Sequence, residues 1–310
     1  MVDSLYGPGV TKTAETATER ELVSQPDTWR IAARRSAPEL ARVLTASGPL
    51  AVIGCGTSWF VAQAIASLRE SAGHGPTDAY TPTEARLGRG YPELLVLSRS
   101  GTTTEVAQLL ERRPVGTRAT AVVAVADTPV ARSADEVVVL DYADEESVVQ
   151  TRFATSVLAA VRAALGEDLE ILARSAAEAL ASRLPAGVVD ARQTVFLGTG
   201  WSIGLAHEAA LKLREVAQAW SESYPAMEYR HGPIALAEPG TFVWVFGDAP
   251  EGLVAQVEVT GAVVVDDALD PLVDLVRVHR LALERAARRG LDPDRPRNLT
   301  RSVVLERPSY

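Results

Sequence analysis

The sequence predicts an α/β protein built on parallel β-sheets. Short apolar runs recur along the chain, and several lead through glycine into a helical pattern. Such alternation is typical of parallel strands that are joined by helices. Two segments, VIGCGTSWFVAQA and FLGTGWSIGLAHEA, have the same strand, G-x-G and helix pattern, and one lies in each half of the chain. We therefore expect a duplicated α/β unit.

The expected strands are rich in valine and leucine, and most are followed by helical patterns. The strands are PLAVIGCG (49–56), ELLVLSRSG (93–101), ATAVVAVAD (119–127), DEVVVLD (135–141), TVFLGTG (194–200), TFVWVF (241–246) and AVVVDD (262–267). Helical patterns cover 57–70, 102–113, 151–184, 202–220 and 275–289, the last of them basic. The expected organisation is a disordered arm (1–20), a first α/β region with a connecting helix (21–184), and a second region with a C-terminal tail (185–310).

Charge and composition exclude several classes of partner. The net charge is −9, which disfavours nucleic acid, because phosphate backbones bind basic surfaces. A phosphorylated small molecule needs only a local site and stays compatible. Cys55 is the one cysteine, no apolar run reaches about 18 residues, and the N-terminus lacks a signal-peptide core. We expect a cytoplasmic protein with no membrane partner.

The two G-x-G turns do not make a dinucleotide fingerprint, which is G-x-G-x-x-G. Trp59 stands where the third glycine of the first copy belongs, and Gly204 comes one position late in the second. No P-loop pattern occurs. Metal ligation is not expected either, because no two of the four histidines have ligand spacing and Cys55 is alone. The sequence predicts neither a cofactor nor a metal.

Hydroxyl groups crowd two predicted strand-to-helix junctions. Gly101 is surrounded by Ser98, Ser100, Thr102, Thr103 and Thr104, and the first G-x-G turn is followed by Thr57 and Ser58. Serine and threonine at such places can simply cap helices. Two junctions with surplus hydroxyls, at strand ends where α/β sheets bind ligands, favour an anion site for phosphate instead.

The stretch HEAALKLREV places Glu208, Lys212 and Glu215 on one side of a predicted helix. By spacing alone, these residues are either an exposed ion-pair row or ionisable groups directed into a pocket. His231 comes before Gly-Pro, so it is expected in a turn or loop.

Five motifs together resemble the sugar isomerase (SIS) family. They are CGTS (55–58), SRSGTT (98–103), EAALKLREV (208–216), RHGPIAL (230–236) and PRNLTRSV (296–303). The resemblance is closest to the isomerase half of glucosamine-6-phosphate synthase and extends to the stand-alone amino-sugar-phosphate deaminase/isomerases. It runs from about Glu21 to the C-terminus. No glutaminase domain is expected, since residues 1–20 are too few and contain no cysteine.

The resemblance implies two flavodoxin-like, three-layer αβα SIS subdomains with parallel sheets. It also implies a homodimer with active sites at the subunit interface. The residues that it implies for the sugar phosphate are Ser58, Ser98, Ser100 and Thr103, with Arg99 and the backbone of Gly56, Thr57 and Gly101 alongside.

The resemblance also implies catalytic roles. Glu215 matches the base that moves a proton between carbon 1 and carbon 2, and Lys212 and Glu208 match further active-site positions. His231 matches the histidine that opens the sugar ring, which the neighbouring subunit supplies in the family. A carboxylate in a dry pocket, a nearby positive charge and an imidazole suit proton transfer, enolate stabilisation and ring opening respectively.

Two departures bear on the reaction. Arg99 stands where the synthase has glutamine, and arginine there is reminiscent of the deaminase/isomerases and would strengthen anion binding. Arg301, which we count with the substrate-binding residues, matches the lysine that forms an imine in the synthase. A guanidinium stays protonated and cannot form that imine, so glutamine-type amination is disfavoured.

Three functions remain open at this point. The first is an isomerase or deaminase acting on a hexosamine or ketohexose 6-phosphate. The second is a lyase or dehydratase that uses the same base for β-elimination on an N-acetylglucosamine 6-phosphate-like substrate. The third is a non-catalytic sugar-phosphate sensor.

Overall fold

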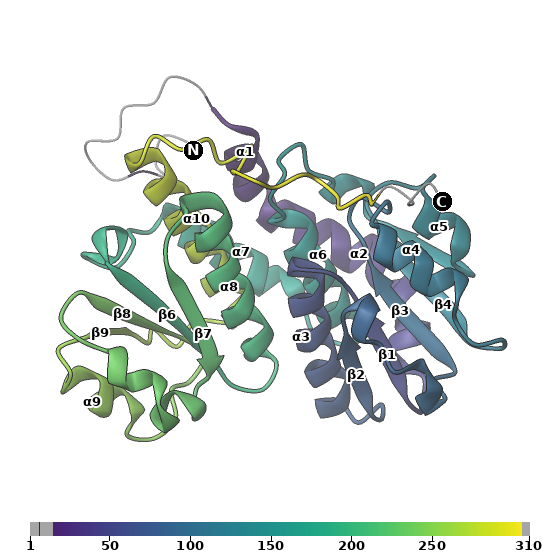
Figure 1. Ribbon diagram of the computed structural model, residues 1–310, viewed down its shortest axis with the longest axis horizontal. Helices are drawn as coiled ribbons and strands as arrows, with labels where there is room; N and C mark the ends of the chain where they lie inside the picture. The colour runs from purple at the N-terminus through teal and green to yellow at the C-terminus, as the bar shows by residue number, and fades with distance from the viewer. Residues whose placement is uncertain (1–5, 7–14, 306–310) are drawn as a thin grey trace. The chain divides into compact units, whose positions relative to one another are not determined.

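The chain consists of two compact units, each with its own parallel sheet (Figure 1). The computed structural model describes Tyr6 and residues 15–305. The first unit contains Thr28–Leu169 and the chain from Asn298 onward, and the second contains the described residues up to Asp27 and Glu170–Arg297. The predicted α/β class with two parallel sheets is confirmed.

The first unit has five parallel strands in the order β2-β1-β3-β4-β5, which is the flavodoxin-like order. The strands are β1 (Leu50–Ile53), β2 (Thr77–Tyr80), β3 (Glu93–Leu97), β4 (Arg118–Val123) and β5 (Glu136–Val139). The helices are α2 (Gln25–Thr45), α3 (Thr57–Ser71), α4 (Thr104–Glu111), α5 (Pro129–Ser133) and α6 (Arg152–Ala164), with short turns η2 (Pro82–Glu84), η3 (Leu87–Arg89) and η4 (Asp141–Ala143).

Helices cover both faces of this sheet because its strands are apolar on both sides. On one face Ile53, Val96 and Val123 join the core formed with Leu109 of α4 and Val130 of α5. The alternate strand residues point to the opposite face. There α3 packs on β1 and α6, and Trp29 Nε1 of α2 donates to Thr155 Oγ1 of α6 at 3.0 Å.

The second unit has four parallel strands in the order β7-β6-β8-β9. The strands are β6 (Gln193–Gly198), β7 (Ser221–Pro225), β8 (Thr241–Phe246) and β9 (Val263–Val265). The helices are α1 (Ala17–Val23), α7 (Leu169–Ala181), α8 (Ser202–Ala217), α9 (Leu253–Glu258) and α10 (Pro271–Arg288), with turns η5 (Val188–Asp190), η6 (Glu228–His231) and η7 (Pro233–Leu236).

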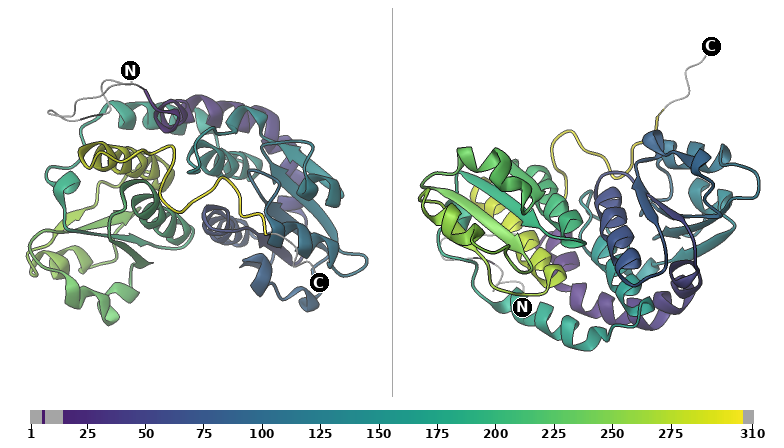
Figure 2. Two further views of the ribbon diagram at one scale, coloured as in Figure 1. Left: turned by 45° about the horizontal axis from the view of Figure 1, so that its top comes forward. Right: turned by 90° about the horizontal axis from the view of Figure 1, so that it is seen from below.

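Helices α8 and α10 lie side by side on one face of the second sheet (Figure 2). Arg277 of α10 stacks over the Trp244 ring of β8, with its guanidinium carbon 4.9 Å from the ring centroid. The other face packs against α9, where Leu253 and Val257 contact Val195 and Val243. Helix α8 is therefore partly buried, because it packs against both the second sheet and α10.

Each expected strand is confirmed, but two strands escaped the sequence analysis. They are β2, with the sequence TDAY, and β7, with SESYP. Both lie at the edge of their sheet and pair with one neighbour only. An edge strand is half-solvated, so it does not need the apolar run by which the central strands were recognised.

The predicted arm over residues 1–20 is wrong at its end, because α1 begins at Ala17. Thr16 and Glu19 form a capping box, and the backbone N–H groups of Ala17 and Thr18 donate to Asp294 at 2.8 Å. These bonds fix the start of α1. Residues 1–5 and 7–14, to which the same prediction applied, lie outside the described residues.

The units also divide the chain elsewhere than at the predicted 184/185 boundary. The predicted helical stretch 151–184 consists of α6 and α7, separated by a turn in which Gly166 has a φ of 102°. Most of α7 belongs to the second unit, where Arg280 of α10 donates to the carbonyl oxygen of Leu180 at 3.1 Å. The predicted basic helix is α10, but its Arg277, Arg280 and Arg285 are buried.

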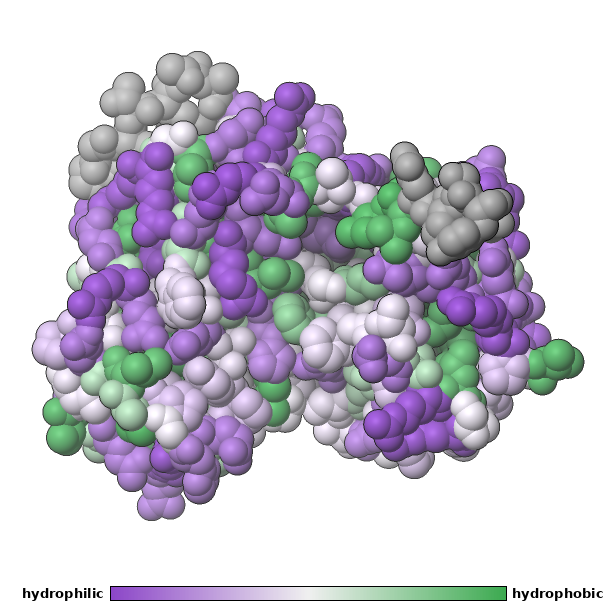
Figure 3. All heavy atoms as spheres, in the orientation of Figure 1, coloured by the Kyte–Doolittle hydropathy of each residue, from purple (hydrophilic) through white to green (hydrophobic). Residues whose placement is uncertain are grey.

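The visible surface mixes hydrophilic side chains with small scattered apolar patches (Figure 3). Among the described residues, no helix combines the length and the apolarity that crossing a membrane requires.

Candidate functional site

The carboxyl ends of β1 and β3 form the first part of the candidate site. The strand order of the first sheet reverses between these two strands, which is where open α/β sheets bind ligands. Two glycines allow the tight turns that follow. A Cβ at Gly54 would lie 2.5 Å from backbone atoms of Ser58, and Gly101 has a φ of 64° and leaves no room for a Cβ beside the Thr128 hydroxyl.

The two turns and the tail enclose one small cavity of about 30 Å³, which we call the serine cavity. Its lining combines hydroxyl, guanidinium, amide and apolar groups. The lining residues are Cys55, Ser58, Leu97, Ser98, Arg99, Ser100, Thr103, Val106, Gln150 and Arg301. Most of the residues predicted to bind phosphate therefore meet in one place. Gly56, Thr57 and Gly101 belong to the same turns but not to this lining.

Three buried polar atoms of residues that line the serine cavity lack a hydrogen-bond partner among the described residues. They are Ser98 Oγ, Arg99 Nε and Gln150 Oε1. Buried polar atoms are nearly always paired in folded proteins, so all three are suited to a polar ligand or an ordered water. The sequence analysis missed Gln150, because it lies in a long segment between β5 and α6 that carried no motif.

Helix capping does not account for the hydroxyl groups of these turns. The N-cap of α3 is Gly56, and the N-cap of α4 is Thr103, whose side chain makes no capping hydrogen bond. Ser100 Oγ accepts a hydrogen bond from the backbone N–H of Thr102 at 3.2 Å. The alternative interpretation of these residues as ordinary caps is thus not what the local geometry shows.

Cys55 adds no negative charge to the serine cavity. Burial, reinforced by the nearby Glu105 carboxylate, raises the pKa of the Cys55 thiol to about 11. The thiol is therefore neutral at neutral pH and does not repel an anion.

The two arginines of the serine cavity are engaged by the protein. Arg99 is 2% exposed and pairs with the buried Glu145 carboxylate at 3.1 Å. Arg301 donates to the carbonyl oxygen of Glu145 and pairs with Asp144. The sequence analysis expected Arg99 to face a phosphate, whereas its guanidinium is directed to the segment that contains Glu145.

The second part of the candidate site is the predicted row on α8, which we call the charged row: Glu208, Lys212 and Glu215. Lys212 Nζ lies 3.3 Å from Glu208 Oε1 and 2.5 Å from Glu215 Oε2. The side chains of Glu208 and Lys212 are 2% and 1% exposed, and that of Glu215 is 19% exposed. This burial excludes the interpretation as a solvated surface row. Glu215 is the member of the row that solvent or a ligand can reach.

A buried histidine lies behind the charged row, and no motif in the sequence indicated it. His279 of α10 is 2% exposed, and its Nδ1 is 3.1 Å from Gln25 Nε2. Burial, with a smaller contribution from the positive charge of Lys212, lowers the pKa of His279 to about 3. The imidazole is thus neutral.

His231 ends the short helix η6 and is exposed. The following Gly232 has a φ of 148°, so the expected turn is present. Within the described part of the chain, no hydrogen bond or ion pair joins His231 to the charged row. The charged row and His231 belong to the second unit, and the serine cavity belongs to the first.

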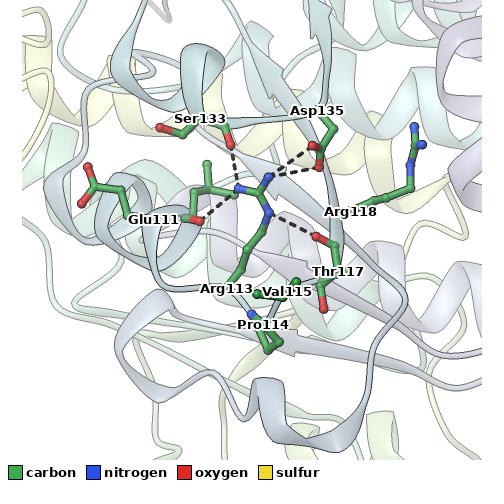
Figure 4. A pocket seen from close by; sticks show the side chains of 10 residues that line it. Glu111, Arg113, Pro114, Val115, Thr117, Arg118, Ser133 and Asp135 are labelled. Atoms are coloured by element: carbon green, nitrogen blue, oxygen red, sulfur yellow. Dashed lines mark hydrogen bonds and ion pairs between the residues drawn. The ribbon is translucent and has the colours of Figure 1, made fainter.

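A larger pocket of about 540 Å³ lies at the amino-terminal ends of β4 and β5, whereas the serine cavity lies at the carboxyl ends of β1 and β3 (Figure 4). Arg113 is directed into its wall, where it donates to the carbonyl oxygens of Leu110 and Ser133 and pairs with Asp135. Arg118 pairs with Glu136. The pocket's two guanidinium groups are therefore engaged within the protein. Across the described residues, no group of three or more His, Cys, Asp or Glu is arranged to hold a metal ion.

Curated proteins similar to this chain include isomerizing glutamine–fructose-6-phosphate aminotransferases. The glutamine–fructose-6-phosphate aminotransferase (isomerizing) of Pyrobaculum aerophilum is 29% identical over 93% of this chain and 57% of its own length. That of Clostridium acetobutylicum is 30% identical over 69% of this chain and 44% of its own length. The chain thus spans about half the length of the curated relatives that it matches. No family model matches the chain.

Solved structures share the fold. The glucosamine-6-phosphate deaminase of Thermotoga maritima has a TM-score of 0.79 and 24% identity, and covers 94% of this chain and 100% of its own. The tagatose-6-phosphate ketose/aldose isomerase of Escherichia coli has a TM-score of 0.76 and 19% identity, with coverages of 97% and 100%. The resemblance predicted from the motifs, to the isomerase part of the synthase and to the deaminases, is confirmed. The fold is the double SIS fold.

Proposed function

We propose, from the double SIS fold and these homologues, that the chain is a sugar-phosphate enzyme. Its reaction would remove a proton at carbon 2 of a hexosamine 6-phosphate, or at carbon 1 of the matching ketohexose 6-phosphate. The outcome would be aldose–ketose isomerisation, with or without release of ammonia. The homologues support the sugar-phosphate class, since each is named as an isomerizing aminotransferase of glutamine and fructose 6-phosphate.

The observation that carries the proposal is the serine cavity. Residues from three separate stretches of sequence, which were expected to bind one phosphate, line a single cavity at the sheet's switch point. Ser98 offers a buried hydroxyl there that no other described residue pairs with. In this proposal Ser58, Ser98, Ser100 and Thr103 bind the phosphate group, and Gln150 contacts the sugar or its phosphate.

The charged row supports proton transfer. The Glu215 carboxylate is accessible, and the buried Lys212 ammonium holds it at 2.5 Å. Glu215 would take the proton next to the carbonyl group, and the ammonium would stabilise the enolate that forms. Glu208 shares the charge of Lys212 from the other side at 3.3 Å. The row therefore places one lysine between two carboxylates, so a sugar that reaches Glu215 would also lie near Lys212.

His231 is proposed to open the sugar ring from a neighbouring subunit. Its exposure and its place on a short turn with a left-handed glycine fit a residue offered to a second copy of the chain. A homodimer is thus part of the proposal.

Arg301 makes glutamine-type amination the least favoured outcome. Its guanidinium stays protonated and bonds to the Glu145 carbonyl oxygen and to Asp144, so it cannot form an imine with a keto sugar.

The test is proton exchange in heavy water. Glucosamine 6-phosphate, fructose 6-phosphate and N-acetylglucosamine 6-phosphate are incubated separately with the protein and followed by NMR. We expect deuterium at carbon 2 of the aldose, and formation of fructose 6-phosphate or ammonia from glucosamine 6-phosphate. Glu215→Gln should abolish the exchange.

The same experiment separates the alternatives. An unsaturated product from N-acetylglucosamine 6-phosphate alone would replace the isomerase by a β-eliminating lyase. Binding of a sugar phosphate with no exchange in any of the three would leave a non-catalytic sensor. Undiminished exchange in Glu215→Gln would remove Glu215 from its role as the base.

A further inference from the structure

Arg99 is the most heavily hydrogen-bonded side chain of the serine cavity. It lies between Ser98 and Ser100, and its buried guanidinium turns to the segment before α6. One terminal nitrogen pairs with Glu145 Oε2 at 3.1 Å. The guanidinium also donates to four backbone carbonyl oxygens, those of Ser147 (3.1 Å), Val148 (2.9 Å), Val149 (3.3 Å) and Arg301 (3.2 Å). These bonds occupy both terminal nitrogens of Arg99, so its buried Nε–H is the one donor left without a partner among the described residues.

Glu145 joins Arg99 to the start of α6. Its side chain is fully buried, and its second oxygen, Oε1, accepts from the backbone N–H groups of Thr151 at 2.5 Å and Arg152 at 2.7 Å and from the Thr151 hydroxyl at 3.0 Å. A carboxylate at the beginning of a helix satisfies the free N–H groups and complements the helix dipole. One carboxylate therefore fixes both the turn after β3 and the N-terminus of α6.

The tail is bound to the same two segments. The Arg301 side chain donates to the backbone carbonyl oxygen of Glu145. Further along, the Thr102 hydroxyl donates to Ser302 Oγ at 2.9 Å, and the Thr104 N–H donates to the Val303 carbonyl oxygen at 3.1 Å. The Leu305 N–H in turn donates to Thr104 Oγ1 at 2.9 Å.

We propose that Glu145 is the positioning residue of the serine cavity and acts through Arg99. The buried pair holds the turn Ser98–Thr103 and the tail residues Arg301–Leu305 in one arrangement, so that the serine hydroxyl groups face the cavity. The identity of the ligand rests on the function proposed above, whereas the positioning role rests on the contacts of Glu145 and Arg99 alone.

This role predicts an effect opposite in sign to the simpler expectation that Arg99 binds phosphate itself. If Arg99 were a ligand, removing the charge of Glu145 would free the guanidinium and strengthen phosphate binding. If Glu145 positions the turn, removing its charge disorders the turn and weakens binding.

The chain offers a matched control for that substitution. Glu93 is a mostly buried carboxylate at the other end of β3, where it pairs with Arg42 at 2.6 Å. Glu93→Gln makes the same chemical change in the same unit, but at the end of β3 that is remote from the serine cavity. Thermal unfolding of both variants shows how much each has lost in stability.

The first measurement is the affinity for inorganic phosphate and for fructose 6-phosphate, by calorimetry on the full chain. We expect Glu145→Gln to weaken both affinities by about tenfold or more, and Glu145→Asp, which keeps the charge, to restore part of the loss. Glu93→Gln should change neither affinity. A Glu145→Gln variant that binds as well as the wild type, or more tightly, overturns the proposal.

The second measurement needs no ligand. Hydrogen exchange at the amides of Thr104 and Leu305 reports the contact between the tail and α4. We expect exchange at both amides to rise at least tenfold in Glu145→Gln and to stay unchanged in Glu93→Gln. The double variant Arg99→Gln/Glu145→Gln leaves no unpaired buried charge, and it should show the same rise in exchange. If Glu145→Gln does not fold, this double variant takes its place in the measurement. Unchanged protection in a folded double variant contradicts the positioning role.

The two arms separate this inference from the proposed function. Failure of the wild-type chain to bind any phosphate would overturn the function, while the exchange arm would still decide whether Glu145 orders the tail.

Discussion

The turns after β1 and β3 in the first unit and the turn after β6 in the second all follow the carboxyl ends of parallel strands, yet they differ in what their hydroxyl groups do. Both sheets have the order in which the second strand of the unit lies outside the first. After β3, Ser98 Oγ is buried at the wall of a cavity and has no hydrogen-bond partner in the part of the chain that the structure describes. After β6, Ser202 Oγ accepts from the Thr199 N–H at 2.8 Å and donates to the Phe246 carbonyl oxygen at 2.8 Å.

The difference shows that the two units of a duplicated fold use their strand-to-helix turns for different purposes. The second unit closes its strand-to-helix turn with its own serine and carries ionisable groups on the side of α8 instead. The first unit leaves its turns open to a ligand. The pattern G-x-G follows β1 in one unit and β6 in the other, so it indicates the strand-to-helix turn that they share, and the chemistry depends on the side chains around that turn.

The largest expected effect lies in the second unit. Glu215→Gln should lower kcat for sugar-phosphate turnover by roughly 10²–10⁴-fold, because the amide cannot accept the proton. The dissociation constant for fructose 6-phosphate, measured by calorimetry, should change by less than about threefold. An equal loss of binding and of turnover would place Glu215 in substrate binding and contradict the division between the two units.

The next effect tests what the G-x-G turns after β1 and β6 share. A Cβ at Gly54 would collide with the Ser58 backbone, and one at Gly198 would collide with the Ser202 backbone. Gly54→Ala and Gly198→Ala should each lower the free energy of unfolding by about 1–3 kcal/mol in urea titrations. Only Gly54→Ala should also weaken sugar-phosphate binding, since it displaces Ser58.

Gly88→Ala is the matched control for this pair, because nothing lies within 4 Å of its Cβ position. It should change the free energy of unfolding by less than about 0.5 kcal/mol. Equal effects of the two tight glycines on ligand binding would break the comparison.

A smaller effect separates the serines. Ser100→Ala removes a hydroxyl from the serine cavity and should weaken phosphate binding by about tenfold, which corresponds to about 1.4 kcal/mol. Ser202→Ala removes a buried hydroxyl of the same type that contacts only its own turn and β8. It should lower the melting temperature and leave phosphate affinity unchanged. A loss of affinity in Ser202→Ala would show that the second turn also takes part in binding.

The smallest expected effect is a dependence of stability on pH within the second unit. His279 has its pKa lowered from 6.5 to about 3, mainly by burial, so between these values the unfolded chain binds a proton that the folded chain does not. Stability therefore falls as pH falls. Burial raises the pKa of Asp274 from 3.8 to about 6, so in that range the folded chain binds the extra proton and stability rises as pH falls.

The two groups should nearly cancel between about pH 4 and pH 6. Urea unfolding as a function of pH checks this. His279→Gln should leave a rise in stability toward pH 4, and Asp274→Asn should leave a fall, each with a slope of at most about 1.4 kcal/mol per pH unit. Slopes of the reversed sign would show that neither group is held in its expected protonation state.

The sequence predicted the parts of this molecule that depend on local pattern. Valine-rich runs located the central strands, and the spacing of Glu208, Lys212 and Glu215 placed them on one side of α8, as observed. The edge strands β2 and β7 were missed because their polar residues leave no apolar run. The break between α6 and α7 was missed because Gly166 alone marks it.

Long-range partners could not be predicted. Arg99 was expected to face a phosphate because charge is visible in a sequence and side-chain direction is not. Its direction depends on Glu145, which is 46 positions away along the chain. The positions of Gln150 and His279 could not be predicted from the sequence either, because each depends on the packing of segments that are distant along the chain.

The central claim is that the serine cavity of the first unit binds the phosphate group of a sugar. Calorimetric titration of the full chain with fructose 6-phosphate, and with fructose under the same conditions, tests it most directly. We predict measurable binding of the phosphate ester, lost on Ser98→Ala/Ser100→Ala, and binding of fructose that is at least about a hundredfold weaker. Equal affinity for the two sugars, or unchanged affinity in the double variant, would contradict the claim.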